Sequence, residues 1–135
     1  MNRARSDGQT AFGFGSGVGA GIAPAAAPVL SGAADGDPTA DGTVGATTST
    51  TSPTGRLYWA VVTNAGVATN AQVIAGSGGN IVAGKAGNQV VTATGTQTIA
   101  TITGLTTATT YQIKFVHLNG DSMQSNQDSV SLTTL

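Results

Sequence analysis

The segment QTIATITGLTTATTYQIKFVHLN, residues 97–119, decides the fold that we predict. It begins as a strand, turns through a threonine-rich corner after Leu105, and continues as a second, longer strand. In the second strand Tyr111, Ile113 and Phe115 stand two residues apart, which is the period of a strand that buries one face. The segment therefore predicts an all-β fold in which these three side chains and Leu105 point into the core.

Tyr111 also predicts a contact that would fasten the corner between the two strands. It follows Leu105 by six residues, so its ring can be buried while its hydroxyl returns to the backbone near the corner. This arrangement is typical of antiparallel sandwiches of the immunoglobulin-like kind. We therefore expect two packed sheets with about seven strands in total.

The run GRLYWAVVTN, residues 55–64, predicts the central strand of the sandwich. Trp59 shares one face of this strand with Leu57 and Val61, whereas Tyr58 lies on the opposite face. Trp59 is the only tryptophan, and we expect it to be the largest side chain of the core. The alternative is a Trp-Tyr platform on which a sugar stacks, but a position within an apolar strand favours the core.

The rest of the chain predicts shorter elements separated by turns. The expected strands are Ala27–Ser31 at an edge, Thr39–Thr50, Gln89–Ala93 and Ser129–Leu135. Residues 65–88 lack a clear period, and within them only Ala71–Ala75, after an Asn70 cap, suggests one helical turn. Gly95 and Thr96 are expected to turn the chain into the segment that begins at residue 97.

The composition excludes several classes of protein. Only 8% of the 135 residues are charged and the net charge is −1, so no basic surface is expected to bind nucleic acid. There is no cysteine, which leaves neither a disulfide framework nor a thiolate metal site. No stretch is long and apolar enough to span a membrane. Little charge also means little repulsion between copies, which favours a protein that works in an assembly.

The sequence divides into an extended glycine- and alanine-rich N-terminal arm, residues 1–27, and a domain, residues 28–135. The arm contains GFGSGVGAG, a composition typical of flexible linkers. Phe12 and Phe14 stand two apart between glycines, so an extended arm would place both rings in one apolar groove of a partner. We take these two residues, with Arg3 and Arg5, as a candidate assembly arm.

Two other interpretations of the arm remain open. The first is an idle tail with no partner, and the residues favour neither this tail nor the assembly arm. A signal peptide could use Arg3 and Arg5 as its positive start and the alanines before Pro28 as its cleavage site. Its apolar region would be AFGFGSGVGAGIAP, which is rich in glycine and would form a poor helix, so this interpretation is disfavoured.

Catalysis is not expected from the residue types present. His117 is the only histidine, so no histidine cluster can hold a metal. A nominal triad of His117, Asp121 and Ser122 would crowd one strand end, and no nucleophile-elbow sequence supports it. We expect His117 near the rim of the sandwich with a hydrogen-bond partner. The sequence therefore predicts no catalytic residue and no enzyme.

An acidic cluster follows the first expected strand. Asp35, Asp37 and Asp41 lie within seven residues, but they lack the glycine and the later glutamate of the twelve-residue calcium loop. Asp-Gly and Asp-Pro pairs are ordinary turn sequences. We therefore predict a turn here, with no metal and no cofactor.

Two segments near the C-terminus resemble the second half of a fibronectin type III domain. They are GLTTATTYQIKFV, residues 104–116, and NGDSMQSNQDSVSLTT, residues 119–134. The positions that match the family pattern are Leu105, Thr109, Tyr111, Ile113 and Phe115. Thr107 and Ala108 replace the usual Pro and Gly, and the usual tryptophan of the second strand is absent. The resemblance implies a fibronectin type III-like sandwich for residues 28–135.

Residues 28–135 also resemble a divergent form of this domain found in phage virion proteins and bacterial surface proteins. The shared features are an L-Y-W strand, an AQV segment and a TATGTQT run, in that order. The resemblance implies a structural virion protein, either a capsid decoration or a head- or tail-associated display protein. Its expected partners are capsid or tail proteins and copies of itself.

The alternative is a secreted or bacterial cell-surface adhesion module. Such a module would bind host glycans through loops, and the candidate loops are Ser77–Lys85 and Gly120–Gln127.

Overall fold

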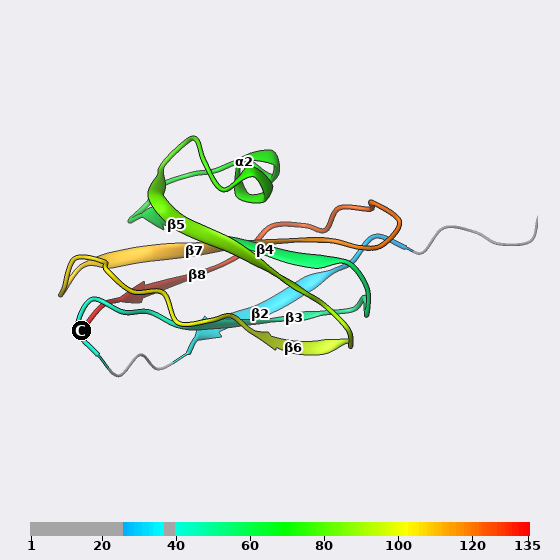
Figure 1. Ribbon diagram of the computed structural model, residues 1–135, viewed down its shortest axis with the longest axis horizontal. Helices are drawn as coiled ribbons and strands as arrows, with labels where there is room; N and C mark the ends of the chain where they lie inside the picture. The colour runs from blue at the N-terminus through cyan, green and yellow to red at the C-terminus, as the bar shows by residue number, and fades with distance from the viewer. Residues whose placement is uncertain (1–25, 37–39) are drawn as a thin grey trace, which may run out of the picture.

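The computed structural model describes residues 26–36 and 40–135, which form two antiparallel sheets packed face to face (Figure 1). The first sheet has the order β2-β3-β6, and the second has the order β5-β4-β7-β8. Their bounds are β2 (Leu30–Asp35), β3 (Ala46–Thr50), β4 (Arg56–Thr63), β5 (Ile81–Val90), β6 (Gly95–Thr98), β7 (Thr110–Leu118) and β8 (Asp128–Thr133). The all-β prediction is confirmed, and the arrangement is compatible with an immunoglobulin-like fold.

The core between the two sheets is built from alternate residues of β4 and β7. Leu57, Val61, Ile113 and Phe115 are completely buried, because the strand period turns them all toward the opposite sheet. The corner residues Leu105 and Tyr111 are each 8% exposed, and they belong to the same cluster. The Tyr111 hydroxyl accepts a hydrogen bond from the backbone N–H of Thr106 at 3.2 Å, which fastens the corner.

The expectation that Trp59 is the largest core side chain is wrong. Trp59 is only partly buried and packs against the margin of the cluster, whereas Phe115 is the largest fully buried side chain. The reason is its partner: Trp59 lies opposite Gly87 on β5, the edge strand of its sheet. Phe115 lies opposite Trp59 on the other side, in β7, and is completely buried.

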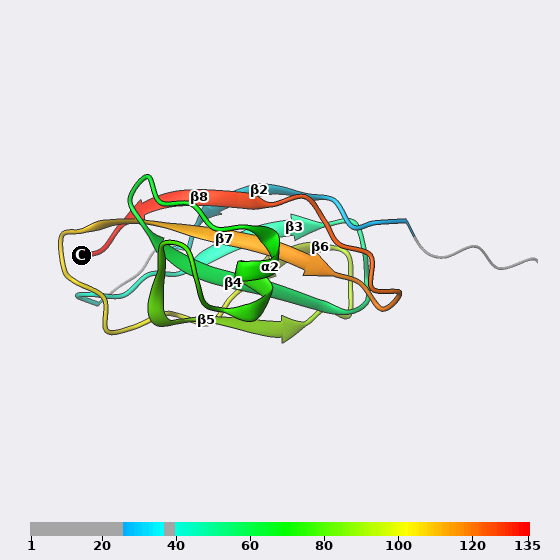
Figure 2. The ribbon, with the colours of Figure 1, turned by 90° about the horizontal axis from the view of Figure 1, so that it is seen from above.

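Along one side of the sandwich β2 approaches β8 (Figure 2). Polar side chains close this side. The side-chain amide of Asn126 accepts from the Leu30 N–H at 2.8 Å and donates to the Leu30 carbonyl oxygen at 3.0 Å. Oδ2 of Asp128 accepts from the Ala33 N–H at 3.0 Å and from the Thr48 hydroxyl at 2.8 Å. These bonds hold together β2 and β8, two edge strands that do not pair with each other.

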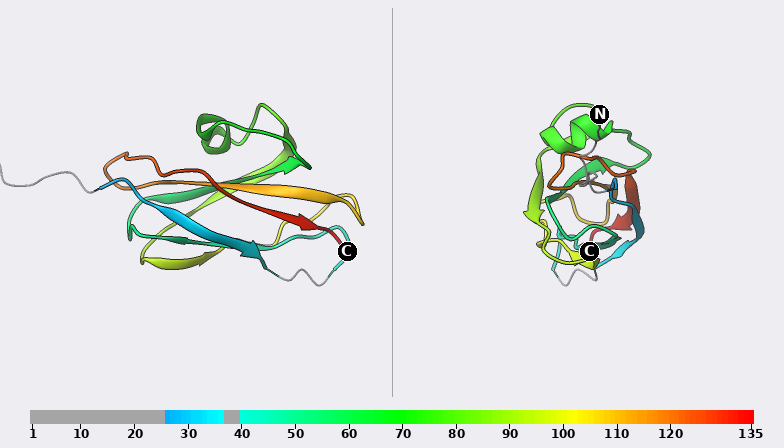
Figure 3. Two further views of the ribbon diagram at one scale, coloured as in Figure 1. Left: turned by 180° about the vertical axis from the view of Figure 1, so that it is seen from behind. Right: turned by 90° about the vertical axis from the view of Figure 1, so that its right-hand side faces the viewer.

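A short helix, α2 (Asn70–Ala75), lies on the outer face of the four-stranded sheet (Figures 1 and 3). Its buried residue Val73 packs against Ala60 of β4 and Val116 of β7. The N-cap is Thr69, not Asn70 as predicted, because Thr69 and Gln72 form a reciprocal capping box. Gly76, with φ of 74°, ends the helix in the left-handed conformation.

Several predicted strand bounds are corrected by the structure. β2 begins at Leu30 rather than Ala27, and β3 begins at Ala46 rather than Thr39. Only Gln89 and Val90 of the predicted strand Gln89–Ala93 lie in a strand, and they end β5, which begins at Ile81. Gly95 and Thr96 lie in β6 instead of a turn, and this strand ends at Thr98, before Leu105. Hydrogen bonding to a neighbouring strand, which the local pattern does not reveal, sets these bounds.

Candidate functional site

The described chain enters the sandwich beside the loop between β7 and β8 (Figure 1). The side-chain nitrogen of Asn119, the residue after β7, donates to the carbonyl oxygen of Ala26 at 3.1 Å. Two residues later Pro28 is buried, and Leu30 begins β2. The start of the described chain, Ala26, is therefore held by a contact to the β7–β8 loop.

The β7–β8 loop is held in one shape by hydrogen bonds of its own. Asn119 is 4% exposed, and its Oδ1 accepts from the backbone N–H groups of Asp121 and Met123 at 3.0 and 2.9 Å. The Ser125 hydroxyl accepts from the His117 N–H at 2.8 Å and donates to the Asn126 carbonyl oxygen. A loop with this many internal contacts gives Ala26 a defined point of attachment.

The same loop contacts the start of α2. Nδ2 of Asn70 donates to Oε1 of Gln124 at 3.0 Å and to the Ser125 carbonyl oxygen at 3.2 Å. Nε2 of Gln127 donates to the Ala68 carbonyl oxygen at 2.9 Å. Ala26, the β7–β8 loop and the start of α2 thus form one continuous surface, and we take it as the candidate attachment surface.

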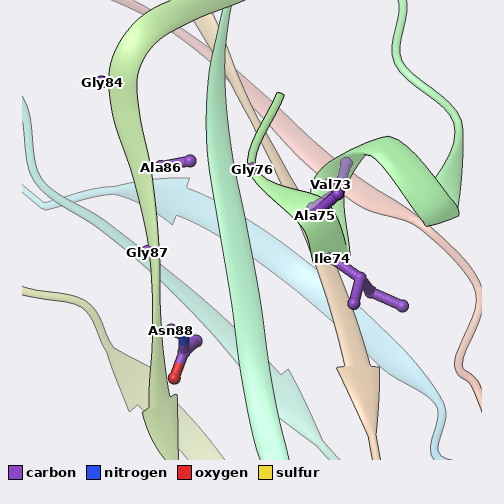
Figure 4. A pocket seen from close by; sticks show the side chains of 8 residues that line it. All are labelled: Val73, Ile74, Ala75, Gly76, Gly84, Ala86, Gly87 and Asn88. Atoms are coloured by element: carbon purple, nitrogen blue, oxygen red, sulfur yellow. The ribbon is translucent and has the colours of Figure 1, made fainter. Parts of the chain in front are cut away.

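A groove with a volume of about 230 Å³ lies between α2 and β5 (Figure 4). Its lining is apolar or glycine apart from one amide side chain, and consists of Val73, Ile74, Ala75, Gly76, Gly84, Ala86, Gly87 and Asn88. No charged side chain lines it. Because glycine and alanine leave backbone groups exposed, the surface of the groove is more polar than these residue types suggest.

His117 lies next to the last residue of β7 and has the predicted hydrogen-bond partner, but it is completely buried. Its Nε2 lies 2.6 Å from the Thr54 carbonyl oxygen, and its Nδ1 lies 2.6 Å from the Thr50 hydroxyl oxygen. Since a carbonyl oxygen only accepts, Nε2 carries the proton, and in the neutral ring Nδ1 accepts from Thr50. The imidazole therefore joins β7 to β3 and to the loop before β4.

The nominal triad does not form around this imidazole. Both ring nitrogens of His117 are engaged by Thr50 and Thr54, so neither is placed to take a proton from Ser122. Ser122 and Asp121 lie in the exposed β7–β8 loop. His117 thus acts as a structural link within this geometry.

The predicted arm residues Arg3, Arg5, Phe12 and Phe14 lie outside the described residues, as does Asp37 of the acidic cluster. Across residues 26–36 and 40–135, no group of three or more acidic, histidine or cysteine side chains is placed to hold a metal ion. Within these same ranges, no helix has both the length and the apolar character needed to cross a bilayer.

The structure separates the components of the predicted sugar sites. Tyr58 packs in the cluster under α2, whereas Trp59 packs at the core on the other face, so the two rings cannot form one platform. The loop after α2 covers only Ser77–Asn80, because Lys85 lies in β5 and donates to the Thr103 carbonyl oxygen at 2.7 Å.

The groove was missed because residues 65–88 lack a regular period. The pattern Thr69-x-x-Gln72 followed by Gly76 is the signal that could have located its helix.

Comparison with protein-family models, with curated proteins and with solved structures finds no match to this chain.

Proposed function

We propose that this protein is a non-enzymatic structural protein of a virus particle, anchored by residues 1–27 as a capsid decoration or a head- or tail-associated display protein. One observation carries the proposal: the start of the described chain and the C-terminus lie at opposite ends of the sandwich (Figures 1 and 2). An anchor that leaves at Ala26 would hold the domain by one end and turn the other end outward.

The finer fold that we propose is a fibronectin type III-like sandwich. Three features support it: the three-stranded and four-stranded sheets, their strand orders, and the bond between the Tyr111 hydroxyl and Thr106 at the corner. Domains with this architecture serve many functions, so the fold supports a display role without specifying it.

The proposed partners are capsid or tail proteins and further copies of this chain, rather than nucleic acid or a membrane. A single small domain offers limited contact area, so repeated weak contacts among neighbouring copies would strengthen attachment. The low charge of the chain supports close packing of copies, because few like charges would repel one another.

Deleting residues 2–25 tests the proposal while leaving every described residue in place. The shortened protein should keep the thermal unfolding transition of the full chain, because the core and the Asn119–Ala26 contact remain. It should be lost from purified particles of the virus that encodes it, as measured by mass spectrometry against the major capsid protein. A control with the arm residues in scrambled order would separate sequence from length. Undiminished incorporation of the shortened protein would exclude the arm as the anchor.

An extracellular module that binds glycans is the second candidate. The observation in its favour is the row of amide side chains Asn70, Gln124 and Gln127 on the attachment surface, since amides are common hydrogen-bond partners of ligands. Binding on a glycan array that is lost in Gln124→Ala, with the unfolding transition unchanged, would support this candidate. An array without binding would count against it.

A further inference from the structure

We propose that the groove between α2 and β5, together with Arg56 beside it, binds one sugar ring that carries a carboxylate. This inference goes beyond the anchoring role, and it stands whether or not residues 1–27 attach the domain to a particle. The site is also distinct from the row of amide side chains Asn70, Gln124 and Gln127, because Asn70 begins α2 and the groove flanks the other end of this helix.

The last turn of α2 supplies the groove with hydrogen-bond acceptors. The last carbonyl oxygens of a helix have no partner within it. The N–H groups that follow α2 bond two of them, those of Gln72 and Val73. Within the part of the chain that the structure describes, no donor bonds the carbonyl oxygens of Ile74 and Ala75, and both residues line the groove. These two oxygens are therefore available to accept from the hydroxyl groups of a ligand.

Asn88 of β5 supplies a donor on the opposite side of the groove (Figure 4). Its Oδ1 accepts from Nη1 of Arg56 at 2.6 Å. A guanidinium group only donates, so this bond assigns the amide oxygen to Arg56 and turns Nδ2 elsewhere. Among residues 26–36 and 40–135, no acceptor bonds this Nδ2. The groove thus offers a side-chain donor across from the two carbonyl oxygens of the helix.

Arg56 gives the site a positive charge. Its guanidinium group is exposed, and within the described ranges Asn88 is the one side chain to which it is bonded. Its other N–H groups stay available, in a fork whose geometry matches the two oxygens of a carboxylate. No acidic residue lines the groove. A carboxylate carries one negative charge, which matches the single arginine.

The size and polarity of the groove indicate the rest of the ligand. Its volume of about 230 Å³ lies below the roughly 300–1,000 Å³ of sites for drug-sized molecules, so it suits one ring. Its exposed surface is more polar than apolar and opens to solvent, which suits a ring that carries several hydroxyl groups. The ligand class that combines such a ring with a carboxylate is a uronic acid.

Nuclear magnetic resonance of the full chain, titrated with D-glucuronate at constant pH and ionic strength, tests the inference. The backbone amide signals of residues 74–76 and 86–88 should shift and reach saturation, whereas those of β3 and β8 should stay in place. Absence of saturable shifts at the groove would overturn the inference.

Two further probes separate the carboxylate from the ring. D-glucose has a hydroxymethyl group in place of the carboxylate, and acetate has the carboxylate without the ring. Each should bind about tenfold more weakly than glucuronate, or weaker still, because each loses one set of hydrogen bonds. Glucose that binds as tightly as glucuronate would overturn the role of Arg56. Acetate that binds as tightly would show an exposed arginine and no sugar site.

Two charge variants test Arg56. Arg56→Gln should weaken the binding of glucuronate about tenfold, to the level of glucose. Lys114→Gln is the matched control, because Lys114 lies opposite Ala60 on the same outer face of the sheet but does not line the groove. It should leave binding within about twofold. Neither side chain is buried, so both variants should keep the thermal unfolding transition of the parent. Undiminished binding by Arg56→Gln would overturn the proposal.

Two helix variants test the groove itself. Ala75→Leu reduces the space in the groove, and Ala71→Leu is its match, because both alanines are exposed on α2 and only Ala75 lines the groove. Ala75→Leu should weaken the binding of glucuronate to the level of acetate, whereas Ala71→Leu should bind as the parent does. Equal binding by the two variants would overturn the assignment to this groove.

Discussion

Trp59 and Gly87 face each other across β4 and β5, and the indole of Trp59 occupies the space where a side chain at position 87 would lie. A Cβ atom built on Gly87 would come within 2.6 Å of Cζ2 of the ring. Gly87 therefore lets the ring cover the margin of the core next to the edge strand. The pair shows why Trp59 is partly exposed while it still packs against the core.

Replacing Gly87 with alanine should destabilise the protein by about 1–3 kcal/mol, because the ring must move away from the new methyl group. Urea unfolding followed by the fluorescence of Trp59, the only tryptophan, measures this loss. The matched control is Gly120→Ala, whose Cβ would meet the Thr54 hydroxyl at an ordinary 3.4 Å. Equal stability of the Gly87 variant and the parent would contradict the packing described above.

The hydrogen bond at the corner predicts a second difference. Tyr111→Phe removes the hydroxyl that accepts from Thr106 and should cost about 0.5–1.5 kcal/mol of unfolding free energy. Tyr58→Phe serves as the control, because the Tyr58 side chain is half-buried under α2 and its hydroxyl has no hydrogen bond among the described residues. The Tyr58 change should stay within about 0.5 kcal/mol. If both substitutions lower the unfolding free energy by the same amount, the hydrogen bond at the corner makes no specific contribution to stability.

The parts of the fold that were predictable are those in which the strand period is strong. Tyr111, Ile113 and Phe115 alternate with polar residues, and the structure turns all three toward the core. In β4 the alternation is hidden by a continuous apolar run, yet Leu57 and Val61 are buried on one face and Ala60 on the other. Apolar residues cover both faces of β4 because α2 covers its outer side.

The parts that were not predictable depend on contacts between distant segments. Apolar and polar residues do not alternate in β5, because glycine and alanine occupy much of its sequence, IVAGKAGNQV. This segment is a strand because it pairs with β4. The buried position of His117 depends on Thr50 and Thr54, which are more than sixty residues away in the sequence. The groove combines α2 with β5, so no single segment indicates it.

The hydrogen bond between the His117 imidazole and the Thr50 hydroxyl predicts that removing this hydroxyl lowers the stability of the protein. Thr50→Val leaves Nδ1 of the buried His117 without a donor and should lower stability by about 1–3 kcal/mol. The valine also removes the acceptor of the Ser52 N–H. Thr47→Val on the outward face of the same strand is the control and should change stability by less than about 0.5 kcal/mol. Comparable effects of the two substitutions would show that the link is not needed.

The double hydrogen bond between Asn126 and Leu30 predicts a local effect at the edge of the sandwich. Asn126→Ala removes both bonds to the Leu30 backbone, so the start of β2 should open more often than the rest of the sheet. Hydrogen exchange of the Leu30 amide should become faster, whereas the exchange of amides in the centre of β4 and β7 should change only as much as the global stability does.

Asn126→Asp makes this test specific for the donor half of the pair. Its carboxylate can still accept from the Leu30 N–H, but it has no hydrogen to donate and would place an oxygen against the Leu30 carbonyl oxygen, 3.0 Å from the present nitrogen. Exchange at Leu30 should then be at least as fast as in the alanine variant, because two acceptors face each other. Exchange as slow as in the parent protein would mean that the N–H contact alone holds β2, and that the bond to the carbonyl oxygen is dispensable.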